Sequence, residues 1–441
     1  MTGDIEDGAF MAISRRQFLA LSGLSAMGAI AHPLYSCSAT PSTGFGALQR
    51  DPETLLELPS GFRYRVISTE GQTMNDGYRV PGAFDGMAAF PGPDGSTILV
   101  RNHELMPGAL NGVQGTTPQK YDERGAGGTT TLVVSGDRQL LRQYTSLAGT
   151  VRNCAGGPTP WNSWLSCEET VYVPEVVRDG VRVSKRHGYV FEVPAAATGP
   201  VNPEPIVALG RFNHEAIAVD PRTGILYQTE DRGDGLFYRF IPNERGNLQA
   251  GGVLEALMVS DRPQLRTHQK FPVQEPVAVS WVPIDEVDPA DDTVRVEGFR
   301  KGAAQFSRGE GICYHDGHFY ITCTSGGDIP NGQVWRYTPG ASHQDGGTLE
   351  LFVQPNNPQK LDYPDNLTMS PWGDLIVCED GRGEQRLIGI TPTGDLYPLA
   401  RNVRNQSEFA GICFAPDGQT MFVNIYAPGI TFAIWREGGM G

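Results

Sequence analysis

A unit of two short apolar strands joined by a Pro/Asp/Gly turn occurs six times after residue 80. Each copy begins with a small or acidic residue, and its second strand ends in polar residues. The copies cover residues 85–104, 154–169, 215–231, 310–325, 366–380 and 410–425. An alternating third segment follows each pair, usually with a fourth strand behind it. Because about four antiparallel strands per repeat are typical of a propeller blade, the repeat predicts an all-β, six-bladed β-propeller.

The composition agrees with many short strands joined by tight turns. The 441 residues include 55 Gly and 33 Pro, and only 19% are charged. We expect residues 41–441 to form a single propeller domain, with residues 281–300 as an insertion between strands. Residues 62–67 are predicted to pair with residues 431–435, so that an N-terminal strand in the last blade closes the ring and removes free edges.

The first forty residues have the pattern of an export signal. Residues 14–19 read Ser-Arg-Arg-Gln-Phe-Leu, and the apolar run 20–31 follows them, which resembles a twin-arginine signal peptide. This run is too short for a permanent membrane anchor. We therefore expect residues 1–40 to engage the twin-arginine export machinery, giving a periplasmic, extracellular or outer-membrane-associated protein. An amphipathic first helix is the alternative, and lipid attachment at Cys37 stays open.

Charge and cysteine content exclude some classes of function. The formal net charge is −15, so a nucleic acid partner would meet a repulsive field. The seven cysteines are odd in number, and folding before export would take place in a reducing compartment, which argues against a disulfide framework. We expect small-molecule partners and a monomer without a stable protein partner.

Acidic residues recur at both ends of the repeated hairpin. The residues before the first strand are Asp85, Cys154, Glu215, Glu310, Asn366 and Ala410. Those after the second strand are Asn102 and Glu104, Glu168 and Glu169, Glu230 and Asp231, Thr324, Glu379 and Asp380, and Asn424. In a propeller these two ends emerge at one face, where clustered carboxylates would raise each other's pKa unless cations bind. Oxygen ligands favour Ca²⁺, whereas a thiolate among carboxylates also suits iron or zinc. Acids that only cap turns are the alternative at each position.

Basic side chains occur in the same register. Arg308 lies two residues before Glu310, His103 and His214 each precede a glutamate, and Arg232 follows an acidic pair. These four are predicted to bind an anionic substrate, since Arg is suited to bidentate recognition of phosphate or carboxylate. A salt bridge to the acidic ring is the alternative for Arg232. No G-x-S-x-G, Walker loop, Cys-x-x-Cys or His-Glu-x-x-His pattern is present.

The segment 153–169, Asn-Cys-Ala-Gly-Gly-Pro-Thr-Pro-Trp-Asn-Ser-Trp-Leu-Ser-Cys-Glu-Glu, resembles the signature of the PhoX alkaline phosphatase family. The similarity continues at residues 101–104, 212–216, 229–232, 308–311, 365–367, 378–381 and 408–411, and so covers nearly the whole mature chain. The resemblance implies an exported phosphomonoesterase whose cofactor combines Fe³⁺ and Ca²⁺.

The resemblance also implies roles for individual residues. Cys154 would be the thiolate ligand of iron, Arg308 would grip the phosphate, and Glu310 would complete the catalytic set. The predicted metal ligands are Cys154, Glu215, Glu310, Asp231, Asp365, Glu168, Glu169, Glu230, Asn102, Glu104, Glu379 and Glu408. Two other classes stay open, namely a calcium-dependent propeller hydrolase of lactones or small esters and a non-catalytic binding propeller of the cell envelope.

Overall fold

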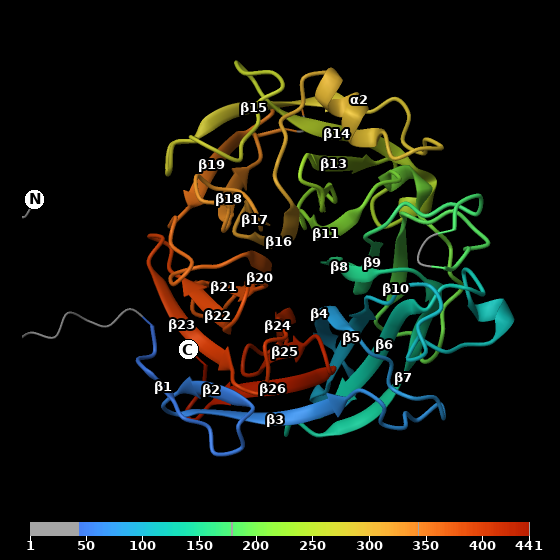
Figure 1. Ribbon diagram of the computed structural model, residues 1–441, viewed down its shortest axis with the longest axis vertical. Helices are drawn as coiled ribbons and strands as arrows, with labels where there is room; N and C mark the ends of the chain where they lie inside the picture. The colour runs from blue at the N-terminus through green and yellow to red at the C-terminus, as the bar shows by residue number, and fades with distance from the viewer. Residues whose placement is uncertain (1–43, 178–179, 343, 441) are drawn as a thin grey trace, which may run out of the picture. The chain divides into compact units, whose positions relative to one another are not determined.

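The computed structural model describes residues 44–177, 180–342 and 344–440. The predicted signal sequence and Cys37 lie outside them. The described residues form a strand-rich, propeller-like domain, so the all-β prediction is confirmed (Figure 1). The helical segments are η1 (Pro93–Gly95), η2 (Thr117–Gln119), η3 (Val207–Leu209), η4 (Leu248–Ala250) and α2 (Val294–Arg300). None of the helices described is long and apolar enough to cross a membrane.

Hydrogen bonding groups the strands into five sheets. The first contains β4 (Phe84–Pro91), β5 (Thr97–His103), β6 (Gly127–Val134) and β7 (Leu140–Thr150), and the second contains β8 (Asn153–Pro158), β9 (Ser163–Glu168) and β10 (Val190–Pro194). The third contains β11 (His214–Val219), β12 (Leu226–Glu230), β13 (Phe237–Pro242), β14 (Gly252–Val259), β15 (Val277–Pro283), β16 (Gly309–His315), β17 (His318–Cys323), β18 (Gln333–Thr338) and β19 (Thr348–Val353). The fourth contains β1 (Leu48–Gln49), β2 (Leu56–Pro59), β20 (Pro364–Met369), β21 (Leu375–Glu379), β22 (Gln385–Ile390) and β23 (Leu396–Asn402). The fifth contains β24 (Phe409–Phe414), β25 (Met421–Ile425), β26 (Ile430–Arg436) and β3 (Phe62–Thr69).

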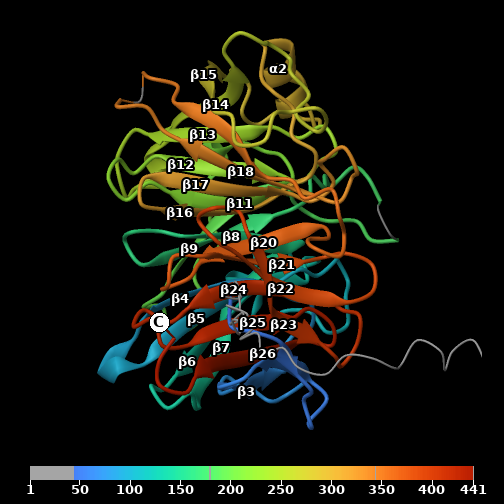
Figure 2. The same ribbon diagram turned by 90° about the vertical axis from the view of Figure 1, so that its left-hand side faces the viewer.

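The prediction of six separate blades is wrong in its number of sheets, because one sheet has nine strands. Strand β15 pairs with β14 on one side and with β19 on the other. This strand joins two four-stranded meanders, β11 to β14 and β16 to β19, into a single sheet. The predicted insertion therefore begins within a strand, and its later part forms α2, beside β14 and β15 (Figure 2).

Six hairpins nevertheless surround one central axis. Their inner strands are β4, β8, β11, β16, β20 and β24, and each contacts the next, with β24 contacting β4. Small residues let these strands approach closely: a Cβ on Gly86 would lie 2.5 Å from the Ala155 Cα, and one on Gly157 would lie 1.8 Å from the Ile217 carbonyl oxygen. The glycines of the repeat therefore keep the ring narrow.

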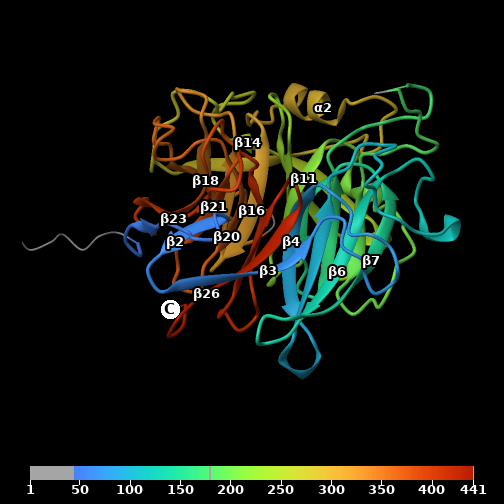
Figure 3. The same ribbon diagram turned by 60° about the horizontal axis from the view of Figure 1, so that its bottom comes forward.

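An N-terminal strand closes the ring, as the sequence predicts. Strand β3 pairs antiparallel with β26, with Arg63 opposite Trp435 (Figure 3). The buried Arg101 guanidinium supports this closure from the neighbouring sheet, because it donates to the hydroxyl groups of Thr431 at 2.6 Å and Ser68 at 3.3 Å. The first and last parts of the described chain thus share one sheet.

Apolar side chains fill the spaces between neighbouring sheets. The largest aromatic cluster contains Tyr227, Phe237, Trp281, Phe319 and Tyr337, from several strands of the nine-stranded sheet. The six cysteines in the described part of the chain are free thiols, and all except Cys313 are buried. Cys167, Cys323, Cys378 and Cys413 pack as small apolar groups in the clusters between the sheets.

Candidate metal centre

One backbone hydrogen bond is repeated in all six hairpins. The residue that follows the second strand donates its N–H to the carbonyl group of the residue directly before the inner strand. The pairs are Glu104 to Ala83, Glu169 to Arg152, Asp231 to Asn213, Thr324 to Arg308, Asp380 to Tyr363, and Tyr426 to Glu408. Each hairpin therefore presents three equivalent positions at the same end of the ring. They are the residue that accepts this hydrogen bond, the residue two positions after it, and the residue that donates the bond.

A β-bulge lies at the functional position of every inner strand. The pairing register shifts between Phe84 and Met87, Asn153 and Gly156, His214 and Ile217, Gly309 and Ile312, Pro364 and Leu367, and Ala410 and Cys413. A bulge leaves a residue unpaired and re-aims its side chain. The side chains at these bulges include Asp85, Cys154, Glu215, Glu310 and Asp365.

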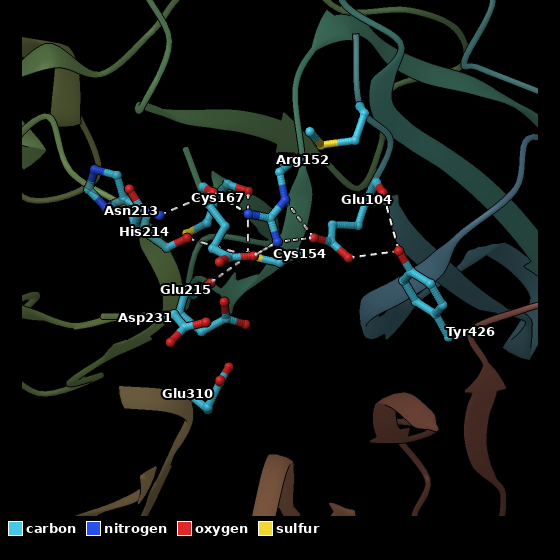
Figure 4. Close-up of polar contacts among 12 residues, drawn as sticks. Glu104, Arg152, Cys154, Cys167, Asn213, His214, Glu215, Asp231, Glu310 and Tyr426 are labelled. Carbon is cyan, nitrogen blue, oxygen red and sulfur yellow. Dashed lines mark hydrogen bonds and ion pairs between the residues drawn. The ribbon is translucent and has the colours of Figure 1, made fainter. Parts of the chain in front are cut away.

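The potential ligand atoms of these positions lie close together. Three groups have ligand atoms within 4.8 Å of one another: Cys154, Glu169 and Glu215; Glu215, Glu310 and Asp365; and Asp365, Asp380 and Glu408. Because Glu215 and Asp365 each belong to two groups, the three form a continuous arc. Figure 4 shows Glu215, Asp231 and Glu310 with their carboxyl groups toward a shared space.

The centre carries far more acidic than basic groups. Its carboxyl groups belong to Asp85, Glu104, Glu169, Glu215, Asp231, Glu310, Asp365, Asp380 and Glu408. The guanidinium groups that pair with them belong to Arg152 and Arg308. We call these residues and Cys154 the acidic centre.

Burial and mutual repulsion raise the pKa of most acids in the acidic centre. Burial, followed by the charge of Asp380, raises the pKa of Asp365 to about 8. Burial also raises the pKa of Glu215, with Glu310 as the next cause. The pKa of the Cys154 thiol is raised by burial and then by Glu215. Multivalent cations would remove this repulsion and favour the ionised forms, so the donor set fits bound metal ions.

Arg308 has the geometry of an anion-binding group held in place. Its Nε donates to Oδ1 of Asp231 and its Nη2 to Oδ2 of Asp231, both at 3.0 Å, and Nη2 also donates to Glu310 at 2.7 Å. Its Nη1 donates to none of the residues that the structure describes. Its backbone is left-handed, with φ of 55°. Non-glycine residues rarely adopt this conformation except where the surrounding structure enforces it, and here the repeated hairpin enforces it also at the equivalent residues Ala83 and Tyr363.

The central channel continues below the acidic centre. A cavity of about 790 Å³ is lined by the residues that follow the acidic positions on each inner strand, among them Met87, Ile217, Ile312, Leu367 and Ile412. The polar end and the apolar remainder of the channel are thus formed by the same six strands.

Residues 43–429 match the family described as alkaline phosphatase PhoX. The chain belongs to the PhoX family. PhoX enzymes depend on metal ions and are exported. Among solved structures, Pseudomonas fluorescens PhoX in complex with vanadate, a transition state analogue, is similar with a TM-score of 0.65 and 20% identity, covering 88% of this chain and 97% of that one. A putative gluconolactonase is similar with a TM-score of 0.43 and 12% identity, covering 88% and 97%. No curated protein matches the chain.

Eight of the twelve metal ligands predicted from sequence in this PhoX-family chain lie in the three ligand groups or pair with the arginines beside them. Cys154, Glu169, Glu215, Glu310, Asp365 and Glu408 belong to the ligand groups, and Asp231 is bound by Arg308. Glu104 is also in the acidic centre, where it contacts Arg152.

Three of the predicted ligands point away from the acidic centre. Glu168, Glu230 and Glu379 are the last residues of β9, β12 and β21. Glu168 accepts hydrogen bonds from the Val151 and Gly188 N–H groups, at 2.9 and 2.8 Å. Glu230 accepts from the Tyr238 hydroxyl, and Glu379 pairs with Arg386. Successive strand residues face opposite sides, so the next residue in each case, and not these three, faces the centre.

Asn102 and the two histidines also lie inside the blades. Asn102 donates to the carbonyl oxygens of Cys154 at 3.1 Å and Ala155 at 2.7 Å, and so supports the bulge. His103 lies between the Gly82 carbonyl and the Thr130 hydroxyl. Burial lowers the pKa of His214 to about 4, which leaves a neutral ring stacked on Phe212.

Arg232 pairs with Asp292, which lies just before α2, at 2.7 Å. The Arg232 side chain is partly exposed. Among the described residues, no ion pair joins it to the acidic centre.

Three residues of the acidic centre, and Tyr426 beside it, are not among the predicted site residues. The sequence indicates Asp85 and Asp380 only as strand-end residues, and it does not single out Arg152 or Tyr426. The Tyr426 hydroxyl donates to Glu104 at 2.8 Å, and Glu104 in turn contacts Arg152 (Figure 4). The spacing offered one signal, because Arg152 precedes Cys154 by two residues just as Arg308 precedes Glu310.

Proposed function

We propose that this PhoX alkaline phosphatase hydrolyses phosphate monoesters at the acidic centre, which holds Fe³⁺ and Ca²⁺. The observation that carries the proposal is the arc of three ligand groups, which concentrates buried carboxyl groups and one thiol around a single axis. Such a concentration of like charge is hard to account for without multivalent cations.

The donor types suggest how the ions are distributed. Cys154, Glu169 and Glu215 combine a thiolate with carboxylates, which suits iron. Asp365, Asp380 and Glu408 offer oxygen only, which suits Ca²⁺. Glu215, Glu310 and Asp365 lie between these two groups and share a residue with each. A thiol in the ligand arc disfavours a calcium-only hydrolase of lactones, since calcium has no use for a sulfur ligand.

Bound metal ions would supply neutralisation of the carboxylates and polarisation of the phosphoryl oxygens. Arg308 supplies the protein's own contribution to phosphate binding. Asp231 and Glu310 fix its guanidinium plane and leave the Nη1 donors for a phosphoryl oxygen. Donors held in this way stabilise charge that spreads over the phosphoryl oxygens in the transition state without reorganising. Cys154 and Glu310 complete the proposed catalytic set by binding the metal ions.

We further infer the arrangement of the whole chain. Residues 1–40 act as a twin-arginine signal, and residues 41–441 form one catalytic domain. The nine-stranded sheet corresponds to two blades joined by β15, which gives six repeat units around the axis. The repeated backbone hydrogen bond in six hairpins supports this count.

Elemental analysis and an aryl phosphate assay at alkaline pH test the proposal. Wild-type protein purified without chelator should contain iron and calcium. We expect Cys154→Ala to lose iron and to lower kcat by more than about 100-fold. Residues that only support metal ligands contribute up to about 100-fold, and loss of a direct ligand should cost more. Cys167→Ala is the matched control, because Cys167 is equally buried in the same hairpin but belongs to none of the ligand groups. Calcium alone with full activity in Cys154→Ala would contradict the iron site.

A further inference from the structure

Arg152 and Arg308 occupy equivalent positions in two hairpins. Each accepts the repeated backbone hydrogen bond, from Glu169 and Thr324 respectively. Each lies two residues before a bulged residue of the inner strand, Cys154 or Glu310. Both have left-handed backbones, with φ of 51° and 55°. Ala83 and Tyr363 have the same conformation at the equivalent positions of two other hairpins, with φ of 48° and 52°, so the conformation belongs to the repeat, and the residue type is what Arg152 and Arg308 share beyond it.

The two guanidinium groups also make the same kind of bridge. Arg308 reaches back to Asp231 of the preceding hairpin and forward to Glu310 of its own. Arg152 reaches back to Glu104, with its Nε at 2.8 Å and its Nη2 at 2.6 Å from the same carboxylate oxygen. Its Nη2 also donates to the Glu169 carboxylate at 2.5 Å, and its Nη1 to the Glu169 carbonyl oxygen at 3.1 Å.

The two arginines differ in how many N–H donors of the guanidinium group are left unused. A guanidinium has five N–H donors. Arg152 directs four of them at Glu104 and Glu169, whereas Arg308 directs three at carboxylates and keeps both Nη1 donors free of the residues that the structure describes. The exposed fractions of the two side chains are similar, 30% and 34%, so exposure does not explain the difference.

We propose that Arg152 is a positioning residue of the metal centre, which holds Glu169 in the ligand group with Cys154 and Glu215 and ties it to Glu104. The inference rests on the proposed function. Glu169 directly follows β9, and its carboxyl group is paired with the Arg152 guanidinium on one side and contacts the Asp231 carboxyl group on the other. The Tyr426 hydroxyl holds the other oxygen of Glu104 and completes a chain across three hairpins.

Arg152→Gln and Arg308→Gln distinguish positioning from substrate binding. We expect Arg152→Gln to lower iron content and the visible thiolate-to-iron absorption, and to reduce kcat by about 10- to 100-fold, as for other residues that orient metal ligands. Inhibition by inorganic phosphate, measured on the metal-loaded fraction, should keep its wild-type Ki. Arg308→Gln should keep its metals and absorption, and its Ki for inorganic phosphate should rise roughly tenfold or more, because a charged donor is lost.

Arg152→Lys keeps the charge but cannot bridge two carboxylates with a planar fork, so it should fall between wild type and Arg152→Gln. It also carries the test if Arg152→Gln does not fold, as judged by far-UV circular dichroism and Tm. Wild-type protein without metals or phosphatase activity would overturn the proposed function itself. If the wild-type protein holds metals and is active, two results overturn the inference on Arg152. In the first, the Arg152 variants keep the metals, the absorption and kcat of the wild type. In the second, they keep the metals and raise the Ki for phosphate as Arg308→Gln does.

Discussion

Neighbouring acidic residues in this protein have opposite environments. Glu168 and Glu169 are adjacent, yet Glu168 is enclosed within its blade while Glu169 belongs to a ligand group. Burial opposes the charge on His187, but Glu168 and then Asp122 raise the pKa of its imidazole to about 9. The acid that ends the strand therefore stabilises the blade, and the acid after it serves the acidic centre.

Exchanging each glutamate for glutamine should separate these two roles. Glu168→Gln should lower the free energy of unfolding by about 3–5 kcal/mol, because His187 and three backbone donors lose a buried anion. Its metal content should stay at the wild-type level in folded protein. Glu169→Gln should lose metal with little loss of stability in the chelated protein. Tm and elemental analysis measure both, and metal loss from Glu168→Gln alone would contradict the assignment.

Part of this pattern could be predicted from the sequence. The recurrence of acids identified Cys154, Glu215 and Glu310 at the right register. It could not show which member of each acidic pair faces the centre. That depends on which residue is the last to pair with the inner strand, and the β-bulge on the inner strand sets this pairing. Arg152 was missed since a single arginine two residues before a cysteine has no meaning until the hairpins are aligned in space.

At the scale of elements, β3 is the strand on which closure depends. It forms the outer strand of the last sheet and contributes buried side chains from Phe62 and Ile67. Without it, β26 would expose an unpaired edge, which invites association with other chains.

A chain beginning at Glu70 should therefore fold poorly. Loss of the buried Phe62 and Ile67 side chains alone removes about 1.5–3 kcal/mol each. We expect a lower Tm and aggregation in size-exclusion chromatography. A chain beginning at Thr43 keeps β3 and serves as the control. Equal Tm values for the two chains would show that β26 does not need this partner.

The pairing of β3 with β26 was predictable because both are alternating apolar segments left over at the two ends of the repeats. The pairing of β15 with β19 was not, since the only bridging residues are Val277 and Ala278. A two-residue contact between strands far apart in sequence leaves no periodic pattern. The repeat therefore gave the correct hairpins but not the number of sheets.

For the whole molecule, the acidic centre couples metal binding to stability. Burial raises the pKa of Asp365 to about 8, from 3.8 for an ordinary aspartate. Between these pH values the folded, metal-free protein keeps a proton that the unfolded chain releases. The free energy of unfolding of the metal-free protein must therefore fall as the pH rises from about 4 to 8.

Chelation followed by thermal unfolding at several pH values checks this consequence. Chelated protein should have a lower Tm at pH 8 than at pH 5, and the metal-loaded protein should lack this decrease because bound cations keep the carboxylates ionised in the folded state. Returning iron and calcium at pH 8 should restore the Tm. A chelated protein whose Tm rises between pH 5 and pH 8 would show that its acids are not held at raised pKa values.

The closing sheet also sets the order in which the protein can be completed during synthesis. Strand β3 leaves the ribosome long before its partner β26, because most of the described chain lies between them. The acidic centre likewise needs Asp85 from the first hairpin and Glu408 from the last. Contacts so distant in the chain form slowly. The nascent polypeptide must therefore wait, with β3 unpaired, until Glu408 and β26 have been made, and only then can metal ions find a finished site.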